Sequence, residues 1–285
     1  MSEQEWRLRA DLPAATVADF EARAQRHETP IDDEQLVWRS WGSGPPLILL
    51  HGVQGAWFHW IRNIDALATA RTLFALDLPG HGDSGLPVEY THESISRALA
   101  TGLEALVGEA SVDILGFSFG GILGGQFAAR YPDKVRRIIV TASGGLGTPF
   151  VVPELKRVRG LEGAQRQEAL RHNLLTLMLH YPQSVDALAM YLLTKCGFRG
   201  PKVGSKLALP HQLLDAIERV TCQVDLVWGE LDQLHFDPAA QLAAVRRVKP
   251  DVEMQVVPDA GHWVMYERAE AFNRIVLEML AAPLR

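Results

Sequence analysis

Six short apolar segments constrain the fold of this chain more than any other feature of its sequence. They contain few alternating polar residues, which is typical of strands buried on both faces of a parallel sheet. Between them lie longer segments with helical periodicity, such as residues 119–131, which end at Pro132. This alternation predicts a doubly wound α/β domain with a mostly parallel sheet. The predicted strands are 47–50, 72–77, 112–116, 136–140, 223–229 and 253–257.

One long stretch lacks this alternation. Residues 145–220 contain helical patterns such as EALRHNLLTLMLH and no convincing buried strand. We therefore expect a helical insertion over 145–220, between two parts of an α/β core at 34–144 and 221–285. Residues 1–33 contain one helical pattern followed by a break at Pro30, and we interpret them as an N-terminal helical extension.

The segment GFSFGG, residues 116–121, gathers glycines around a single serine directly after the apolar run VDIL. Glycine is unfavourable inside regular structure, so such a cluster indicates a place where side chains do not fit. G-x-S-x-G between a strand and a helix is typical of a nucleophile elbow, a tight turn that presents the serine hydroxyl. We therefore predict that Ser118 is a nucleophile.

A serine nucleophile needs a base to take its proton and an acid to hold that base, and after an elbow serine the acid precedes the histidine. Asp232 in WGELDQL and His262 in VPDAGHW follow two predicted strands, whose carboxyl ends share one edge of a parallel sheet. Asp237 suits a helix N-cap and Glu230 lies too close to the strand, so we choose Asp232. His235 lies nearby but lacks the preceding glycine that gives His262 a short loop.

Two backbone N–H groups are candidates for stabilising the oxyanion of acyl transfer. Phe119 follows the serine, at the positive end of the predicted helix. The segment HGVQG, residues 51–55, follows a predicted strand, and we expect the second N–H from Val53. We interpret His51 as a side chain that holds this loop rather than a proton-transfer group.

Charge and composition exclude several classes of function. The net charge is −6 with a pI near 5.9 and no long run of lysine and arginine, which disfavours nucleic-acid binding. The N-terminus lacks the apolar stretch of a signal peptide, and no segment reaches the length of a membrane span, so we expect a soluble, cytoplasmic protein with no membrane partner. Asp77, His81 and Asp83 lie in DLPGHGDSG, whose proline and glycines indicate a tight loop rather than a metal site.

Five motifs together resemble those of alpha/beta-hydrolase fold enzymes. HGVQG, DLPGHGDSG, GFSFGG, WGELDQ and AGHW occur in the order and spacing of that superfamily, within residues 34–285. The resemblance implies a triad of Ser118, His262 and Asp232 under an inserted helical cap, with no cofactor and no metal.

Within that superfamily the chain is similar to capped carboxylesterases and to hydrolases that split carbon–carbon bonds in ring-fission (meta-cleavage) products. The sequence GHW followed by YE is similar to the latter, in which the tryptophan after the histidine, here Trp263, lines the pocket. Phe117 occupies the position where those enzymes usually carry asparagine. Arg199 would bind a substrate carboxylate as a cap arginine does in that group, and a solvated surface arginine is the competing interpretation. Phe117, Trp263 and Arg199 are therefore candidate substrate contacts.

Our leading hypothesis is a cofactor-independent serine hydrolase for a small, largely apolar carboxylic ester or related carbonyl substrate. Two alternatives stay open. One is a carbon–carbon bond hydrolase of ring-fission products, and the other is a non-catalytic receptor that binds a ligand on the hydrolase fold, because a fold does not determine function. The expected partner is a small-molecule substrate, and the sequence leaves a homodimer open.

Overall fold

The computed structural model describes residues 3–151, 153–195 and 207–285. In these ranges the strands form an eight-stranded sheet with the order β1-β2-β4-β3-β5-β6-β7-β8. β1 pairs with β2, and β2 with β4, in antiparallel fashion, while the other neighbours are parallel. The predicted α/β fold with a mostly parallel sheet is confirmed. The strands are β1 (Gln25–Ile31), β2 (Glu34–Trp41), β3 (Pro46–Leu50), β4 (Thr72–Leu76), β5 (Val112–Phe117), β6 (Val135–Thr141), β7 (Gln223–Gly229) and β8 (Glu253–Val257).

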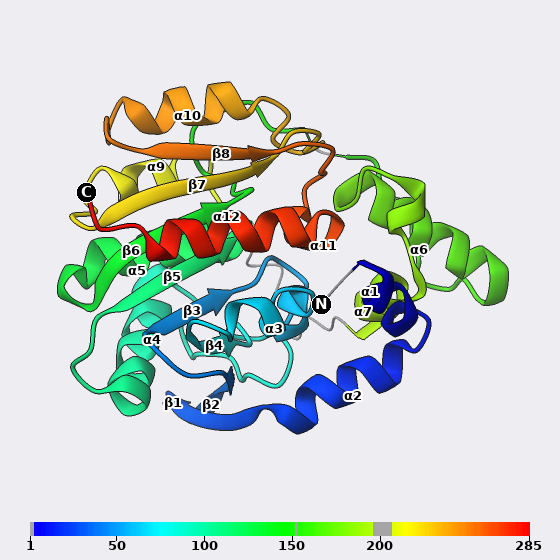
Figure 1. Ribbon diagram of the computed structural model, residues 1–285, viewed down its shortest axis with the longest axis horizontal. Helices are drawn as coiled ribbons and strands as arrows, with labels where there is room; N and C mark the ends of the chain where they lie inside the picture. Colours follow the sequence, from blue (N-terminus) through cyan, green and yellow to red (C-terminus); the bar gives the residue numbers. More distant parts are fainter. Residues whose placement is uncertain (1–2, 152, 196–206) are drawn as a thin grey trace.

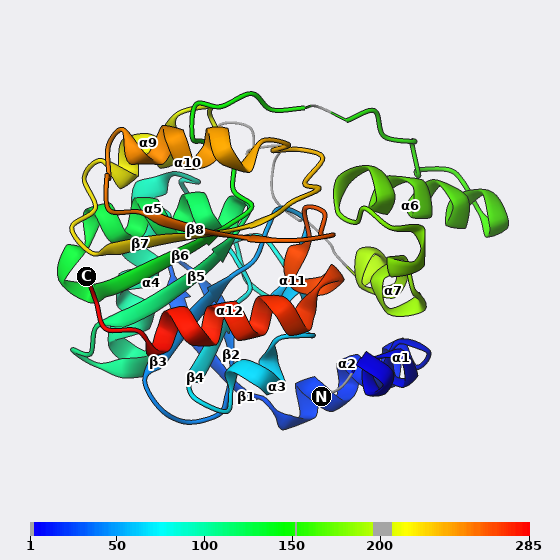
Figure 2. The ribbon, with the colours of Figure 1, turned by 45° about the horizontal axis from the view of Figure 1, so that its top comes forward.

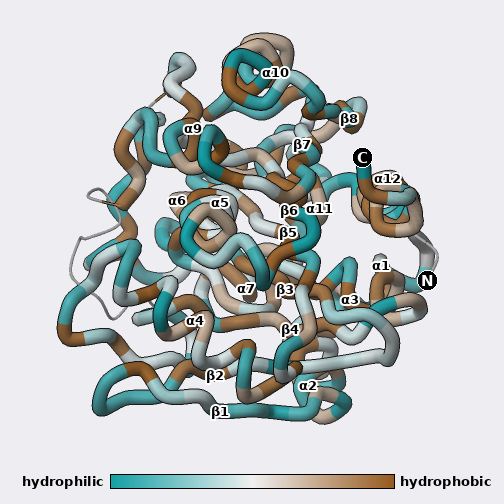
Figure 3. Tube along the Cα trace, turned by 90° about the vertical axis from the view of Figure 1, so that its left-hand side faces the viewer, coloured by the Kyte–Doolittle hydropathy of each residue, from teal (hydrophilic) through white to brown (hydrophobic). Residues whose placement is uncertain are grey.

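Helices cover both faces of this sheet (Figure 1). Figure 3 shows α4, α5 and α9 on one side of the strands and α3 and α12 on the other. The described α-helices are α1 (Glu3–Ala10), α2 (Pro13–Arg23), α3 (Ile64–Leu67), α4 (His92–Val107), α5 (Phe119–Arg130), α6 (Gly163–Leu177), α7 (Ala187–Lys195), α9 (Gln212–Ile217), α10 (Pro238–Arg246), α11 (Val264–Glu267) and α12 (Ala269–Ala281). Short 3₁₀ helices are η1 (Trp57–Trp60), η2 (Pro132–Lys134) and η3 (Pro182–Ser184).

The two faces of the sheet build two separate buried clusters. Leu47 and Leu49 of β3 pack toward the α12 side, whereas Ile48 and Leu50 pack toward α4 and α5. Successive side chains of a strand point to opposite faces, so an unbroken apolar run is what a strand covered on both sides requires. All six predicted strands are present, each within two residues of its expected limits.

The N-terminal segment differs from its expectation. Residues 1–33 were expected to be a helical extension, but the helix α2 ends at Arg23 and β1 follows as an edge strand that contains Pro30. An edge strand tolerates proline, because one row of its backbone groups faces away from the sheet. Its sequence QRHETPI is mostly polar and half-exposed, which is why the apolar pattern does not reveal it.

The stretch between β6 and β7 is helical where it is described. α6 and α7 lie beyond the carboxyl ends of the strands (Figures 1 and 2). α9 differs, because Leu213 and Ile217 place it in the buried cluster with α5 although it falls inside the predicted insertion 145–220. In the described ranges, no helix combines the length and the apolar character needed to cross a membrane.

The N-terminal helices pack against the insertion. α1 and α2 both contact α7, and Figure 2 shows the three helices grouped at one end of the molecule. Trp6 and Phe20 stack with ring centroids 6.0 Å apart and belong to the same buried cluster as Leu188 and Leu192 of α7. The extension therefore supplies core residues to the helical segment.

We predict that Phe20→Ala lowers the free energy of unfolding by about 3–5 kcal/mol, because it empties a fully buried aromatic site. The matched control is Leu12→Ala in the same segment, where the side chain is 64% exposed and no change is expected. Urea unfolding of the two variants measures both values. Equal stability of the two variants would show that the extension is not part of the folded core.

Candidate active site

Ser118 lies in the turn between β5 and α5. Its φ of 51° and ψ of −117° belong to a region that residues other than glycine rarely adopt, and such strain is concentrated in functional turns. The turn requires glycine on both sides. A Cβ on Gly120 would lie 2.1 Å from the carbonyl oxygen of Leu50, and a Cβ on Gly116 would lie 2.6 Å from that of Gly120. This is the backbone geometry expected of a nucleophile elbow.

Asp232 and His262 meet in the loops that follow β7 and β8. The Nδ1–H of His262 donates to Oδ2 of Asp232 at 2.9 Å, and both side chains are buried. The second carboxylate oxygen, Oδ1, accepts the backbone N–H groups of Leu234 (2.9 Å) and His235 (3.0 Å). The carboxylate is thus held by its own loop while it holds the imidazole.

Opposing effects act on the pKa of Asp232. Burial raises it, but the neighbouring His262 and the N–H of His235 favour the charged form, and the pKa ends below its ordinary value. An ionised Asp232 keeps the proton of His262 on Nδ1. Nε2 is then the basic nitrogen of the ring, which is the one that a serine hydroxyl would need.

The imidazole of His262 lies against the end of β5. Its ring centroid is 5.0 Å from that of Phe117, the residue directly before Ser118. The Asp232–His262 pair therefore contacts the residue directly before Ser118, and its action on the serine stays a prediction. The ring of Phe117 is buried and also contacts His59, with centroids 5.8 Å apart.

The sequence does not reveal how the His262 loop is anchored. Glu267 is buried and accepts the backbone N–H of Gly261 at 2.7 Å, and also those of His180 and Tyr181 at 2.9–3.1 Å. In addition, the backbone N–H of Trp263 donates to the carbonyl oxygen of Met178 at 2.7 Å. These bonds tie the histidine loop to the segment between α6 and η3. The one signal of this anchoring in the sequence is that an acidic residue, Glu267, directly follows the mostly apolar segment HWVMY.

The residues that carry the two predicted oxyanion donors lie at the same cavity as the serine. Val53 and Phe119 both line the cavity that Ser118 borders, and Val53 is 47% exposed. Within the described part of the chain, neither backbone N–H donates a hydrogen bond. Two unpaired N–H groups beside a serine can bind the oxygen of a tetrahedral intermediate.

His51 holds the loop that carries Val53. Its Nδ1–H donates to the carbonyl oxygen of Gly52 at 2.7 Å, and its Nε2 accepts the backbone N–H of Leu78 at 2.9 Å. Burial, followed by the neighbouring His81 and His59, lowers the pKa of His51 well below its ordinary value. Because one neutral tautomer satisfies both bonds, His51 links two loops and is not available to carry protons.

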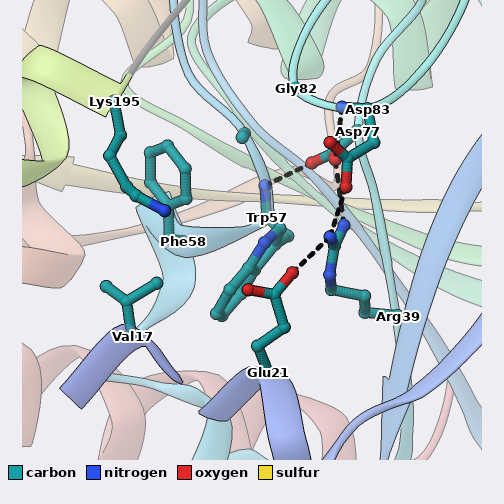
Figure 4. A pocket seen from close by; sticks show the side chains of 10 residues that line it. Val17, Glu21, Arg39, Trp57, Phe58, Asp77, Gly82, Asp83 and Lys195 are labelled. Carbon is teal, nitrogen blue, oxygen red and sulfur yellow. Dashed lines mark hydrogen bonds and ion pairs between the residues drawn. The ribbon is translucent and has the colours of Figure 1, made fainter. Parts of the chain in front are cut away.

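The charges of DLPGHGDSG bond the backbone and a buried arginine. Asp77 accepts the backbone N–H groups of Trp57 (2.8 Å) and Asp83 (3.1 Å), and also Arg39 at 3.0 Å (Figure 4). Arg39 pairs in turn with Glu21 of α2. Among the residues that the structure describes, no group of three or more His, Cys, Asp and Glu side chains is arranged to hold a metal ion.

Val53 lines two cavities. The larger cavity has a volume of about 480 Å³, and Ser118 is one of the residues that line its mainly apolar walls. The smaller, about 60 Å³, is bordered by Trp263 together with side chains of α6 and α7. Trp263 therefore borders a cavity, whereas Phe117 is not among the residues that line either one. Arg199 lies outside the described residues.

Comparison with known proteins agrees with this architecture. A sequence model described as "Alpha/beta hydrolase family" matches residues 47–275. The chain belongs to the alpha/beta hydrolase family. The resemblance seen in the five motifs is confirmed, and the protein is a hydrolase of this fold.

Curated relatives of this hydrolase have different activities. It is 28% identical to the "dihydrolipoyllysine-residue acetyltransferase component of acetoin cleaving system" of Pseudomonas putida, over 96% of this chain and 74% of that protein. It is also 28% identical to the "2-hydroxy-6-oxo-6-phenylhexa-2,4-dienoate hydrolase" of Burkholderia cepacia, over 84% of this chain and 89% of the relative. Among solved structures, naproxen esterase (carboxylesterase NP) of Bacillus subtilis superposes with a TM-score of 0.76 at 18% identity, over 98% and 99% of the two chains. The activities in the names of these three proteins differ.

The buried histidines of this hydrolase make its stability depend on pH. Burial, followed by the neighbouring His81 and His262, lowers the pKa of His59 to about 3. The unfolded chain therefore binds a proton at residue 59 below about pH 6.5 that the native state does not bind, so this residue lowers stability as the pH falls.

We predict that His59→Leu makes the pH dependence of unfolding shallower by about 1 kcal/mol per pH unit between about pH 6 and pH 4. Urea unfolding of both proteins at several pH values measures the two slopes. The comparison of slopes does not depend on how the substitution changes stability at pH 7. Identical slopes would mean that His59 is protonated in the native state.

Proposed function

We propose that this hydrolase cleaves a small, uncharged carboxylic ester through a triad of Ser118, His262 and Asp232 and an acyl-enzyme. The observation that carries the proposal is the convergence at one cavity. Ser118, Val53 and Phe119 line the same apolar space, and His262, which is hydrogen-bonded to Asp232, packs against His235 of its lining and against Phe117 next to the serine.

The proposed reaction has two halves. The Oγ of Ser118 attacks the ester carbonyl carbon and passes its proton to Nε2 of His262, while the N–H groups of Val53 and Phe119 donate to the oxyanion. The carbon–oxygen bond to the alcohol then breaks, and the alcohol leaves with the proton from His262. Water attacks the acyl-enzyme by the same route and releases the acid. Asp232 stabilises the positive charge that the imidazole carries in each half.

Charge at the cavity favours an uncharged ester as the substrate. Among its described lining residues there is no lysine, arginine, aspartate or glutamate. A carboxylate in such a space would lose its hydration without gaining a partner, which is strongly unfavourable. A dienoate, such as the substrate in the name of the Burkholderia cepacia relative, carries a carboxylate.

Carbon–carbon bond hydrolysis is the second candidate. It is supported by the 28% identity to that dienoate hydrolase, and it would require Arg199 to supply the positive charge that the described walls lack. In both candidates, we propose that the part of residues 145–220 that precedes α9, with α6 and α7, acts as a cap over the core. Phe150, Ala208 and Pro210 from that range line the cavity, which supports this division.

We predict that a fluorophosphonate probe labels Ser118, and that Ser118→Ala abolishes labelling and lowers kcat/KM for short p-nitrophenyl esters at least about a thousandfold. Ser96→Ala, which removes a buried hydroxyl within α4, is the matched control. It should keep both the labelling of Ser118 and the kcat/KM for the esters. Mass spectrometry of the labelled peptide and steady-state rates measure the outcome. Full turnover by Ser118→Ala, or labelling at another residue, would refute the proposed nucleophile.

The same assay separates the two candidate reactions. A ring-fission dienoate is tested beside the esters, and its loss of colour is followed with time. A higher kcat/KM for the dienoate than for every ester would favour carbon–carbon hydrolysis.

A further inference from the structure

A second imidazole, that of His235, borders the cavity beside Ser118. The residue is only 4% exposed, and its backbone is fixed at both ends. Its N–H donates to Oδ1 of Asp232 at 3.0 Å, and its carbonyl oxygen accepts the indole N–H of Trp228 at 3.3 Å. Both bonds are made by the backbone of His235, so the imidazole ring takes no part in them.

The ring of His235 is packed by aromatic groups. Its centroid lies 5.2 Å from that of Phe150, 5.7 Å from His262 and 6.1 Å from Trp228. Within the described residues, neither of its ring nitrogens has a hydrogen-bond partner. Neither nitrogen is among the fully enclosed side-chain atoms that lack a partner, so they are open to water in the cavity, and a ligand there can replace that water as their partner. The cavity is the remaining direction from which a partner can come.

Gly144 leaves the edge of this ring open. A Cβ on Gly144 would lie 3.3 Å from Cε1 and 3.6 Å from Nε2 of His235, so a side chain there would cover the part of the ring that carries Nε2. Gly144 lines the same cavity, and it is not among the residues with positive φ. Its backbone conformation therefore does not require glycine.

The other polar groups of the cavity are largely committed. The hydroxyl of Thr148 donates to Oε1 of Gln241 at 2.6 Å, and Ser118 is the proposed nucleophile. Burial, together with the neighbouring His262, lowers the pKa of His235 to about 4, so the ring is neutral near pH 7. A neutral imidazole offers one donor and one acceptor and no charge.

We propose that His235 is a substrate-recognition residue and that the substrate carries, besides its ester group, an uncharged oxygen atom, which is an ether, carbonyl or hydroxyl oxygen. This deepens the proposed function, since it places the ligand beside Ser118. The ring selects substrates with an oxygen-bearing chain over those with a purely hydrocarbon chain, and the apolar walls bind the rest of the chain. It also gives no advantage to a carboxylate, because the ring contributes no positive charge.

Binding of stable ketones to the Ser118→Ala protein tests this without any turnover. The probes are three pairs of equal length in which an ether oxygen replaces a methylene group: methoxyacetone with pentan-2-one, 4-methoxybutan-2-one with hexan-2-one, and 5-methoxypentan-2-one with heptan-2-one. NMR titration gives Kd for each. For each variant we take the ratio of the two Kd values within a pair. The free ligands are the same for every variant, so the difference in their hydration cancels when the ratios of two variants are compared.

We expect that adding His235→Leu reduces the preference for the ether by about three- to tenfold in at least one pair, the range of one neutral hydrogen bond. Gly144→Ala should also reduce it, because it covers the ring edge while the histidine remains. Ile122→Val, on the apolar wall, is the control and should change both members of a pair by the same factor.

An unchanged ratio in all three pairs, or no binding of any ketone, would overturn the role of His235. The proposed function fails by a different result, namely an unlabelled Ser118 in the wild-type protein. The two failures are therefore distinguishable.

Discussion

The arrangement of this hydrolase depends on the hydrogen bond between Asp232 and His262. The two residues come from loops after neighbouring strands, and they can meet only because β7 and β8 are parallel and end at the same edge. The carboxylate is ionised and held by two backbone N–H groups of its own loop. A fixed anion in turn fixes the tautomer of the imidazole, and with it the nitrogen that would face the serine.

Five of the six predicted strands can be predicted because burial on both faces leaves a direct pattern in the sequence, as in LILL of β3. The sixth, β8, is an edge strand with mostly exposed side chains, and its apolar residues alone indicate it. The outer hairpin cannot be predicted in the same way. β1 is polar and exposed, and β2 contains Arg39, whose burial depends on Asp77 from a distant loop and Glu21 from α2. The N-terminal helices are likewise explained only by their contacts with α7.

The candidate site also has one part that a local sequence pattern predicts and one part that depends on tertiary contacts. Ser118 is predictable because the requirements of the elbow are local, and chain order indicates Asp232 and His262. The triad as a catalyst stays a prediction, as do the oxyanion donors. The anchoring of the His262 loop by Glu267 joins residues 87 positions apart, and the place of His235 in the cavity depends on Gly144 from another loop. Such roles arise from tertiary contacts that no local pattern encodes.

The most direct measurement is a crystal structure of the protein after reaction with a small fluorophosphonate. The account predicts a covalent bond from Ser118 Oγ to phosphorus, with the phosphoryl oxygen about 2.7–3.1 Å from the N–H groups of Val53 and Phe119 and Nε2 of His262 facing Oγ. A phosphoryl oxygen turned away from both N–H groups, or an imidazole other than that of His262 facing the serine, would contradict it.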